Sequence, residues 1–331
     1  IMVYSATMYA LLCGVSCEKY LQKQIIMLIL AIAVCIFLSK FNYKVLDKLA
    51  LPLYFIVLIF LIAVLFQKGY RGVHRWLRIW KITFQPSMLA KYAIIILISH
   101  ILKDEEKLQS FSKGVFPVML YTLIYGALLG LEPSMGMMVL ITLTAIATMI
   151  VSGVKPKYIL LISLLLLGGF ILAAYKIPYV RHRIDIFLNK SSGQVRTAIL
   201  GIGSGGFFGV GLGSGRCKML VVAYPHTDFM FATIAEELGF AGVLMLLFLY
   251  FALMIKGFKI ALKAPDRFSS LLSFGITFCI ILNAVIHIGV STGLCPPTGL
   301  PLPFLSASGS ALISDFAAIG VLLNISKKKI E

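Results

Sequence analysis

Residues 269–293 read SSLLSFGITFCIILNAVIHIGVSTG, and this stretch contains no Asp, Glu, Lys or Arg. An apolar run of about 20 residues is long enough to cross the hydrocarbon core of a bilayer as a helix. A spanning β-strand would instead alternate between apolar and polar residues, which this stretch does not do. The stretch therefore predicts a transmembrane helix in an integral membrane protein.

Similar runs recur on both sides of this stretch. Of the 331 residues, 60% are hydrophobic and only 13% are charged, whereas soluble domains carry about 25% charged residues. The chain opens without Met inside an apolar run, so we expect its first span to be truncated. We place ten spans at residues 1–16, 25–39, 50–67, 85–102, 116–131, 135–153, 157–175, 230–255, 269–293 and 303–325.

The predicted fold class is an all-α polytopic membrane protein with ten transmembrane helices, the first truncated. We predict one membrane domain over residues 1–331, with one long outer loop, residues 176–229, between spans seven and eight. Basic residues near span ends favour the cytoplasmic side. With ten spans, five basic segments fall on one side, so we predict that both termini are cytoplasmic. These segments are 40–48, 103–113, 155–157, 256–267 and Lys327–Lys329.

Two segments on the predicted outer side are also basic. Residues 68–81 hold five Lys or Arg and no acid, and residues 176–229 hold seven, against Asp185 and Asp228. We favour an anion site such as a phosphate or pyrophosphate headgroup, because Arg binds phosphate bidentately and Lys binds it as a point charge. The alternative is that these bases reach lipid headgroups. Since the basic residues lie in membrane loops, the net charge of +17 does not predict a nucleic-acid partner.

The long outer loop contains a glycine-rich stretch. Within residues 201–215, eight residues are Gly, and apolar side chains alternate with them. Irregular backbone in a membrane protein is tolerated only against protein or a wet cavity. We therefore expect this stretch to be packed rather than disordered.

An acid follows at the point where the loop meets the bilayer. Asp228 lies in Pro225–Ala232, and Glu236 follows about two helical turns later on nearly the same face. Acids at membrane depth cost about 2.5–3.5 kcal/mol and are candidates for function. A low-dielectric boundary raises a carboxyl pKa and suits Asp228 to general-base chemistry. The alternative is that Asp228 caps the next helix.

The order and spacing of motifs over nearly the whole chain resemble the SEDS family, the FtsW/RodA membrane glycosyltransferases. The matching residues are Met2–Ala6, Arg75–Leu77, Phe84–Ser87, Ala90–Lys91, Glu132–Pro133, Gly136, Gln194, Ala198–Ile199, Gly203–Gly206, Gly209, Gly211, Lys218, His226–Phe229, Phe231–Ala232, Glu236–Gly239, Gly242, Pro297–Phe304 and Ser306. No single motif is decisive, but their order along the chain is specific.

The resemblance implies polymerisation of lipid II into glycan strands at the outer face of the bacterial cytoplasmic membrane. Asp228 would deprotonate the acceptor hydroxyl. Arg75, Lys91 and Lys218 would neutralise the pyrophosphate of the leaving group, a form of charge stabilisation that often dominates catalysis. The other substrate-binding residues that it implies are Gln194, Ser204, His226, Thr227 and Glu236.

The implied partners are lipid II, a monofunctional class B penicillin-binding protein with transpeptidase activity, and other membrane proteins of the divisome or elongasome. The resemblance implies no certain cofactor and is compatible with a divalent cation, Mg or Mn. The six Cys form no paired metal-binding pattern, so we predict no metal site from them.

The chain departs from the family pattern at several positions. Met88 stands where the family usually has Glu, so Lys91 is either free for lipid phosphate or paired with another acid. Ser134 replaces a common Asp, and Tyr224 replaces a frequent Glu. Residues Met2–Ala6, Arg181, Arg183 and Phe187–Asn189 favour the division-type FtsW branch over the elongation-type RodA branch.

Two rival functions remain open: a lipid II flippase or other transporter, and a non-catalytic scaffold for a transpeptidase. Carriers usually hold charged sites near the bilayer midplane, in broken helices from paired halves. Here the acid and the bases gather near one face, and no internal repeat is evident. Glu236 is the residue that most favours a transporter.

Overall fold

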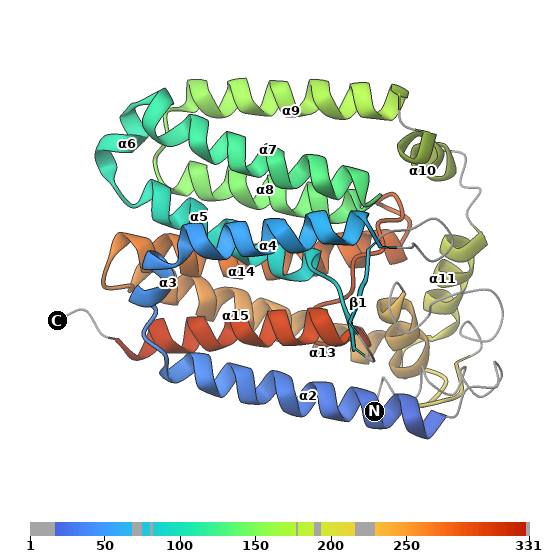
Figure 1. The fold of residues 1–331 in the computed structure, drawn as a ribbon. Coiled ribbons are helices and arrows are strands. Elements are labelled where there is room, and N and C mark those ends of the chain that lie inside the picture. The colour runs from blue at the N-terminus through green and yellow to red at the C-terminus, as the bar shows by residue number, and fades with distance from the viewer. Residues whose placement is uncertain are drawn as a thin grey trace.

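The computed structural model describes residues 17–67, 75–79, 82–176, 178–188, 193–215 and 229–328. Long helices dominate these residues and run side by side (Figure 1). The long helices are α2 (Cys17–Lys40), α4 (Ala50–Leu65), α5 (Ser87–Leu102), α7 (Phe116–Leu131), α8 (Met135–Val151), α9 (Pro156–Lys176), α13 (Met230–Leu262), α14 (Arg267–Ser291) and α15 (Gly309–Lys327).

Every predicted span after the first overlaps one of these helices, and the first, residues 1–16, lies outside the described residues. Five helical segments are long and apolar enough to cross a membrane, those of α2, α7, α13, α14 and α15, and the shorter apolar helices include α4, α5 and α8. The span count of ten stays a prediction.

Two predicted boundaries are wrong. The last span was expected over residues 303–325, but its helix begins only at Gly309, because the proline-containing segment before it is irregular. The span expected over residues 230–255 continues to Leu262 and is interrupted at Gly239, which has a positive φ of 65°.

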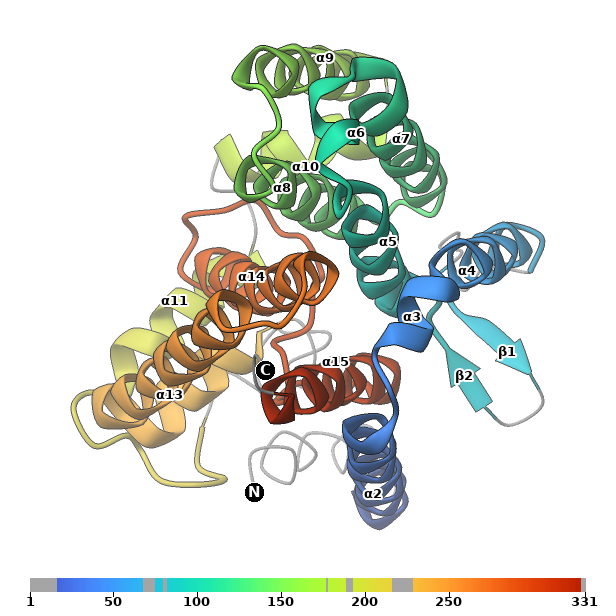
Figure 2. The same cartoon turned by 90° about the vertical axis from the view of Figure 1, so that its left-hand side faces the viewer.

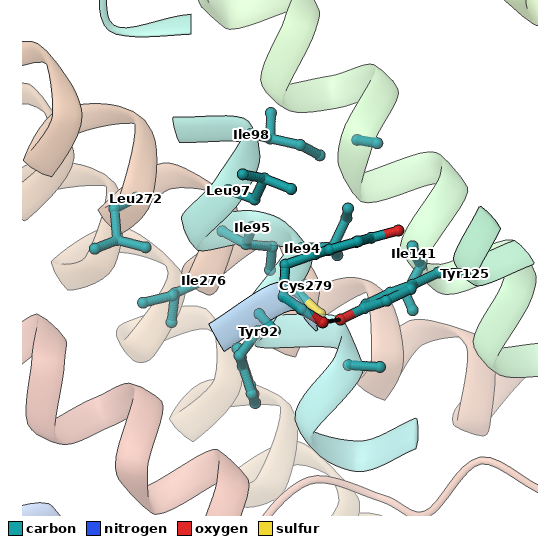
Figure 3. Close-up of a cluster of buried hydrophobic side chains, with 14 of the residues drawn as sticks. Tyr92, Ile94, Ile95, Leu97, Ile98, Tyr125, Ile141, Leu272, Ile276 and Cys279 are labelled. Atoms are coloured by element: carbon teal, nitrogen blue, oxygen red, sulfur yellow. Dashed lines mark hydrogen bonds between the residues drawn. The ribbon is translucent and has the colours of Figure 1, made fainter. Parts of the chain in front are cut away.

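α5 and α14 lie inside the bundle, whereas α9 and α2 lie at opposite edges (Figure 2). Apolar side chains fill the space between α5, α8 and α14, where Ile95 of α5, Ile141 of α8 and Ile276 of α14 are all buried (Figure 3). By contrast, α2 leaves Ile26 and Ile29 largely exposed on its outer face. A bilayer would cover such a face, as expected for a membrane bundle.

The five basic segments that were predicted to share one side do meet at one end of the bundle, the end that carries α3 (Lys44–Lys48) and α6 (Glu105–Gln109) in Figure 1. Contacts join four of the five segments, and one of the contacts reaches Ser152, three residues before segment 155–157. They are Tyr43 Oη to Asp266 Oδ2 at 2.5 Å, Lys103 Nζ to Asp47 Oδ2 at 2.6 Å, Arg267 Nη2 to the Ser152 carbonyl at 2.6 Å and Lys328 Nζ to Asn42 Oδ1 at 3.0 Å. The cytoplasmic orientation of this end stays a prediction.

The opposite end carries α10 (Pro178–Leu188) and α11 (Gly193–Ser204) (Figure 1). These two helices lie in the long outer loop, where the apolar side chains that were expected to pack, among them Leu200, Phe207 and Phe208, are exposed. The all-helical fold class is confirmed, with one short strand pair in addition. Strands β1 (Leu77–Ile79) and β2 (Ile82–Phe84) form an antiparallel pair in which Leu77 lies opposite Phe84, where the basic segment 68–81 and the connection to the span from residue 85 were expected.

Candidate functional site

The break in α13 is the central feature of the end that carries α10 and α11. At Gly239 the helix loses its regular hydrogen bonds, so the carbonyls before the break need other donors. The glycine-rich stretch supplies them, since the Val210 N–H donates to the Glu236 carbonyl at 3.0 Å and the Gly211 N–H donates to the Glu237 carbonyl at 3.2 Å. Residues 201–215 therefore supply the hydrogen-bond donors that the break removes from α13.

The same stretch also accepts hydrogen bonds from the far side of the break. The Phe240 N–H donates to the Gly206 carbonyl, and the Ala241 N–H donates to the Phe207 carbonyl, both at 3.0 Å. The two backbones come so close that a Cβ at Gly205 would overlap the Ala235 carbonyl. Glycine is thus required at this position for the approach.

Two buried acids face the end of the glycine-rich stretch. The carboxyls of Glu236 and Glu237 converge on Gly215, where an added Cβ would lie 2.8 Å from Glu236 Oε2 and 3.1 Å from Glu237 Oε1. Both acids are almost completely covered. The segment that follows Gly215, residues 216–228, holds the predicted site residues Lys218, His226, Thr227 and Asp228, and it lies outside the described residues.

The first turn of α13 begins directly after that segment. Phe229 occupies the N-cap position without a side-chain cap, so the N–H groups of the first turn need partners from elsewhere. His287 of α14 provides one, because its Nε2 accepts the Phe231 N–H at 3.5 Å while its Nδ1 lies 2.7 Å from the Leu300 carbonyl. These two bonds assign the proton to Nδ1.

The irregular segment before α15 is fixed from three sides. Arg183 of α10 donates to the Pro297 carbonyl at 2.5 Å, and Tyr250 of α13 donates to the Pro303 carbonyl at 2.8 Å. Gly136 of α8 allows the segment to approach closely, since an added Cβ would lie 2.6 Å from Thr298. Residues 297–308, which we name the proline segment, therefore join α8, α10, α13 and α14.

Arg75 lies over the turn between α7 and α8. Its Nε donates to the Glu132 carbonyl at 3.3 Å, and Nη2 donates to the Pro133 carbonyl. The Glu132 side chain is fully buried, and neither carboxyl oxygen has a hydrogen-bond partner among the described residues. Burial raises the pKa of Glu132 to about 8, although the Arg75 guanidinium acts in the opposite direction. Glu132 is therefore largely protonated at neutral pH.

Lys91 is paired with an acid on another helix. Its Nζ lies 2.6 Å from Asp315 Oδ1 of α15, and both side chains are buried. Of the two alternatives for Lys91, pairing with an acid is the one that the structure contains. Sequence reasoning missed Asp315, although an Asp within an apolar run is itself a signal.

The structure separates the remaining predicted residues. Gln194 and Ser204 are exposed at opposite ends of α11, Glu236 is buried in α13, and Arg75 is half-buried above α7. His287 was missed as well, and a His inside a predicted span could have been the signal. No group of three or more His, Cys, Asp or Glu that could hold a metal occurs in the described ranges.

The chain is similar to known proteins over its whole length. The family of FtsW, RodA and SpoVE, described as cell cycle proteins, matches residues 1–331. A probable peptidoglycan glycosyltransferase FtsW from Geobacter sp. (strain M18) is 36% identical over 298 residues, which are 87% of this chain and 81% of that protein.

Two solved structures share the fold. One, described as "Structural coordination of polymerization and crosslinking by a peptidoglycan synthase complex", superposes with a TM-score of 0.81 at 27% identity and covers 98% of this chain and 94% of that chain. The other, the rod shape determining protein RodA of Thermus thermophilus, has a TM-score of 0.72 at 26% identity and covers 100% of this chain and 94% of that chain.

Proposed function

The chain belongs to the FtsW/RodA/SpoVE family, and from that membership we propose how it acts as a peptidoglycan glycosyltransferase of the SEDS type. Its substrate is lipid II, which serves as both donor and acceptor. The reaction takes place at the end of the bundle that carries α10 and α11, which we place at the outer face of the bacterial cytoplasmic membrane.

Asp228 is the general base of this reaction. It takes the proton from the acceptor hydroxyl, the hydroxyl oxygen forms a bond with the anomeric carbon of the donor, and the bond from that carbon to undecaprenyl pyrophosphate breaks. The observation that carries this assignment is the position of Asp228 directly before Phe229, the N-cap residue of α13. The first turn of that helix is held by His287.

The leaving pyrophosphate needs positive charge, and Arg75 and Lys218 supply it. The outer-face segments that carry them are rich in Lys and Arg, which is consistent with an anionic leaving group. Arg75 is fixed at this end by the carbonyls of Glu132 and Pro133. Lys91 is covered and bonded to Asp315, so we assign it a different role below.

Gln194 and Ser204 of α11, with His226, Thr227 and Glu236, complete the proposed substrate contacts. The partner is a class B penicillin-binding protein, a proposal supported by the similarity to a chain from a peptidoglycan synthase complex. The similarity to FtsW proteins supports a role in cell division.

A lipid II flippase is the competing function, and the break in α13 beside Glu236 is the observation that favours it. Purified protein in liposomes with fluorescent lipid II, with and without the transpeptidase partner, separates the two. Glycan polymer on a gel supports the glycosyltransferase. Transfer of lipid II between leaflets without any polymer would support the flippase instead.

A further inference from the structure

An interior ion pair joins α5 to α15. Lys91 Nζ and Asp315 Oδ1 are 2.6 Å apart, and the Tyr92 hydroxyl donates to the same oxygen at 2.8 Å. The side chains of Lys91 and Asp315 are 0% and 1% exposed, so water does not screen the pair.

Each partner lies near the end of its helix that faces the candidate site. Lys91 is one turn after Ser87, where α5 begins, and Asp315 is less than two turns after Gly309, where α15 begins. Upstream of α5 lies the hairpin of β1 and β2, and upstream of α15 lies the proline segment. A second bond ties the same two elements, since the Gln85 N–H donates to Ser310 Oγ at 3.1 Å.

Stability alone is a weak reason for a buried pair of this kind. Removing two charges from water costs about as much as their attraction returns, and well-packed apolar residues are often as stable. Asp315 also leaves Oδ2 buried without a hydrogen-bond partner among the described residues, which adds to the cost. What the pair does provide is one defined arrangement of two helices, because only one register lets both charges meet.

We propose that Asp315 is a positioning residue for glycosyl transfer, which acts through Lys91 to hold the proline segment at a fixed place beside the start of α5. The inference rests on the proposed function. The proline segment carries this effect to α13, because Leu300 bonds to His287 and His287 bonds to the first turn after Asp228.

Position 88 allows two effects of Asp315 to be tested separately: the attachment of α15 to α5, and the neutralisation of the Lys91 charge. Met88 is buried and lies three residues before Lys91 on the same helix, a spacing at which side chains meet. The double variant Met88→Glu with Asp315→Asn therefore returns an acid to Lys91 but removes the ion pair that joins α15 to α5. Met88→Gln with Asp315→Asn is the matched control, which has the same shape and no charge.

The experiment measures polymerisation of lipid II and the thermal midpoint of all variants in detergent. Asp315→Asn is expected to lower kcat about ten- to a hundredfold, the range for a displaced reacting group, with little change in KM. Met88→Glu with Asp315→Asn is expected to regain the midpoint of the wild type but not its kcat, and the Met88→Gln control to regain neither.

Recovery of kcat together with the midpoint in the Met88→Glu double variant would overturn the proposal, because neutralisation of Lys91 would then suffice. Wild-type kcat in Asp315→Asn would overturn it as well. If Asp315→Asn does not fold, the Met88→Glu double variant decides alone. A wild-type chain that makes no polymer in the same assay would count against the proposed function itself, so the two failures are distinguishable.

Discussion

His287 on α14 and Phe231 on α13 are joined by a hydrogen bond of 3.5 Å, from the backbone N–H of Phe231 to the imidazole Nε2. Phe231 is the second residue of its helix, where N–H groups have no partner within the helix. The other imidazole nitrogen bonds to the Leu300 carbonyl. One side chain thus fixes the start of α13 and the proline segment to each other.

We expect His287→Leu to lower both stability and kcat. It would leave the Phe231 N–H and the Leu300 carbonyl buried without partners, at about 1–3 kcal/mol for each group. His287→Asn keeps one donor and one acceptor in its side-chain amide and should retain most activity. The measurements are the thermal midpoint in detergent and steady-state polymerisation. Equal kcat in His287→Leu and the wild type would show that the bridge does not matter to the reaction.

Arg75→Lys should be nearly as harmful as Arg75→Ala if the guanidinium binds the pyrophosphate. Lys cannot reproduce a bidentate fork, and the loss of a charged hydrogen bond costs about 1.5–3 kcal/mol. This corresponds to roughly ten- to a hundredfold in kcat/KM. Steady-state polymerisation by both variants, at equal membrane insertion, is the test. Full activity of Arg75→Lys would show that the guanidinium fork does not bind the pyrophosphate.

The raised pKa of Glu132 predicts that the stability of the protein depends on pH. The folded-state pKa of Glu132 is about 8, above the ordinary value of 4.5, so the folded chain holds this proton more tightly than the unfolded chain does. The contribution of Glu132 to stability is therefore full below pH 4.5, falls as the pH rises toward 8 and is level above it. The slope is at most about 1.4 kcal/mol per pH unit.

Glu132→Gln keeps the shape and removes the titration, so its thermal midpoint should change less over this range than that of the wild type. Midpoints of both proteins in one buffer series provide the comparison. Parallel curves for the two proteins would mean that Glu132 does not titrate in this range.

The glycine-rich stretch offers a matched pair of positions. Gly205→Ala should lower stability by about 1–3 kcal/mol, because its Cβ would overlap the Ala235 carbonyl beside the break in α13. Gly203→Ala meets nothing within 4 Å and lies in α11, so it should be neutral or slightly stabilising. Thermal midpoints compare the two. Similar effects at both positions would contradict the close approach.

Much of the fold was predictable because apolar length is a local property. The runs that contain α2, α7 and α14 each satisfy the length and composition of a span on their own. The break at Gly239 was not predictable in the same way. It depends on hydrogen bonds from Val210 and Gly211, which lie almost thirty residues earlier in the chain.

The contacts of the candidate site were likewise only partly predictable from local sequence. Motif spacing identified Arg75 and Glu236, whose surroundings the structure describes, and Asp228, which lies outside the described residues. The partner of Lys91, Asp315, is 224 residues away, and Met88 indicated only that Lys91 was either free for lipid phosphate or paired with an acid elsewhere. Such pairings depend on how helices are arranged in space, which local patterns do not encode.

The central claim is that Asp228 is the base of a lipid II polymerase, and polymerisation by Asp228→Asn tests it most directly. The variant keeps nearly the same shape but cannot accept a proton at neutral pH. Purified wild type and Asp228→Asn, inserted equally and with the same thermal midpoint, would be given fluorescent lipid II together with the transpeptidase partner. The account predicts glycan polymer from the wild type and none from the variant, a loss of at least about a hundredfold in rate. Polymer from Asp228→Asn at a rate close to that of the wild type would contradict it.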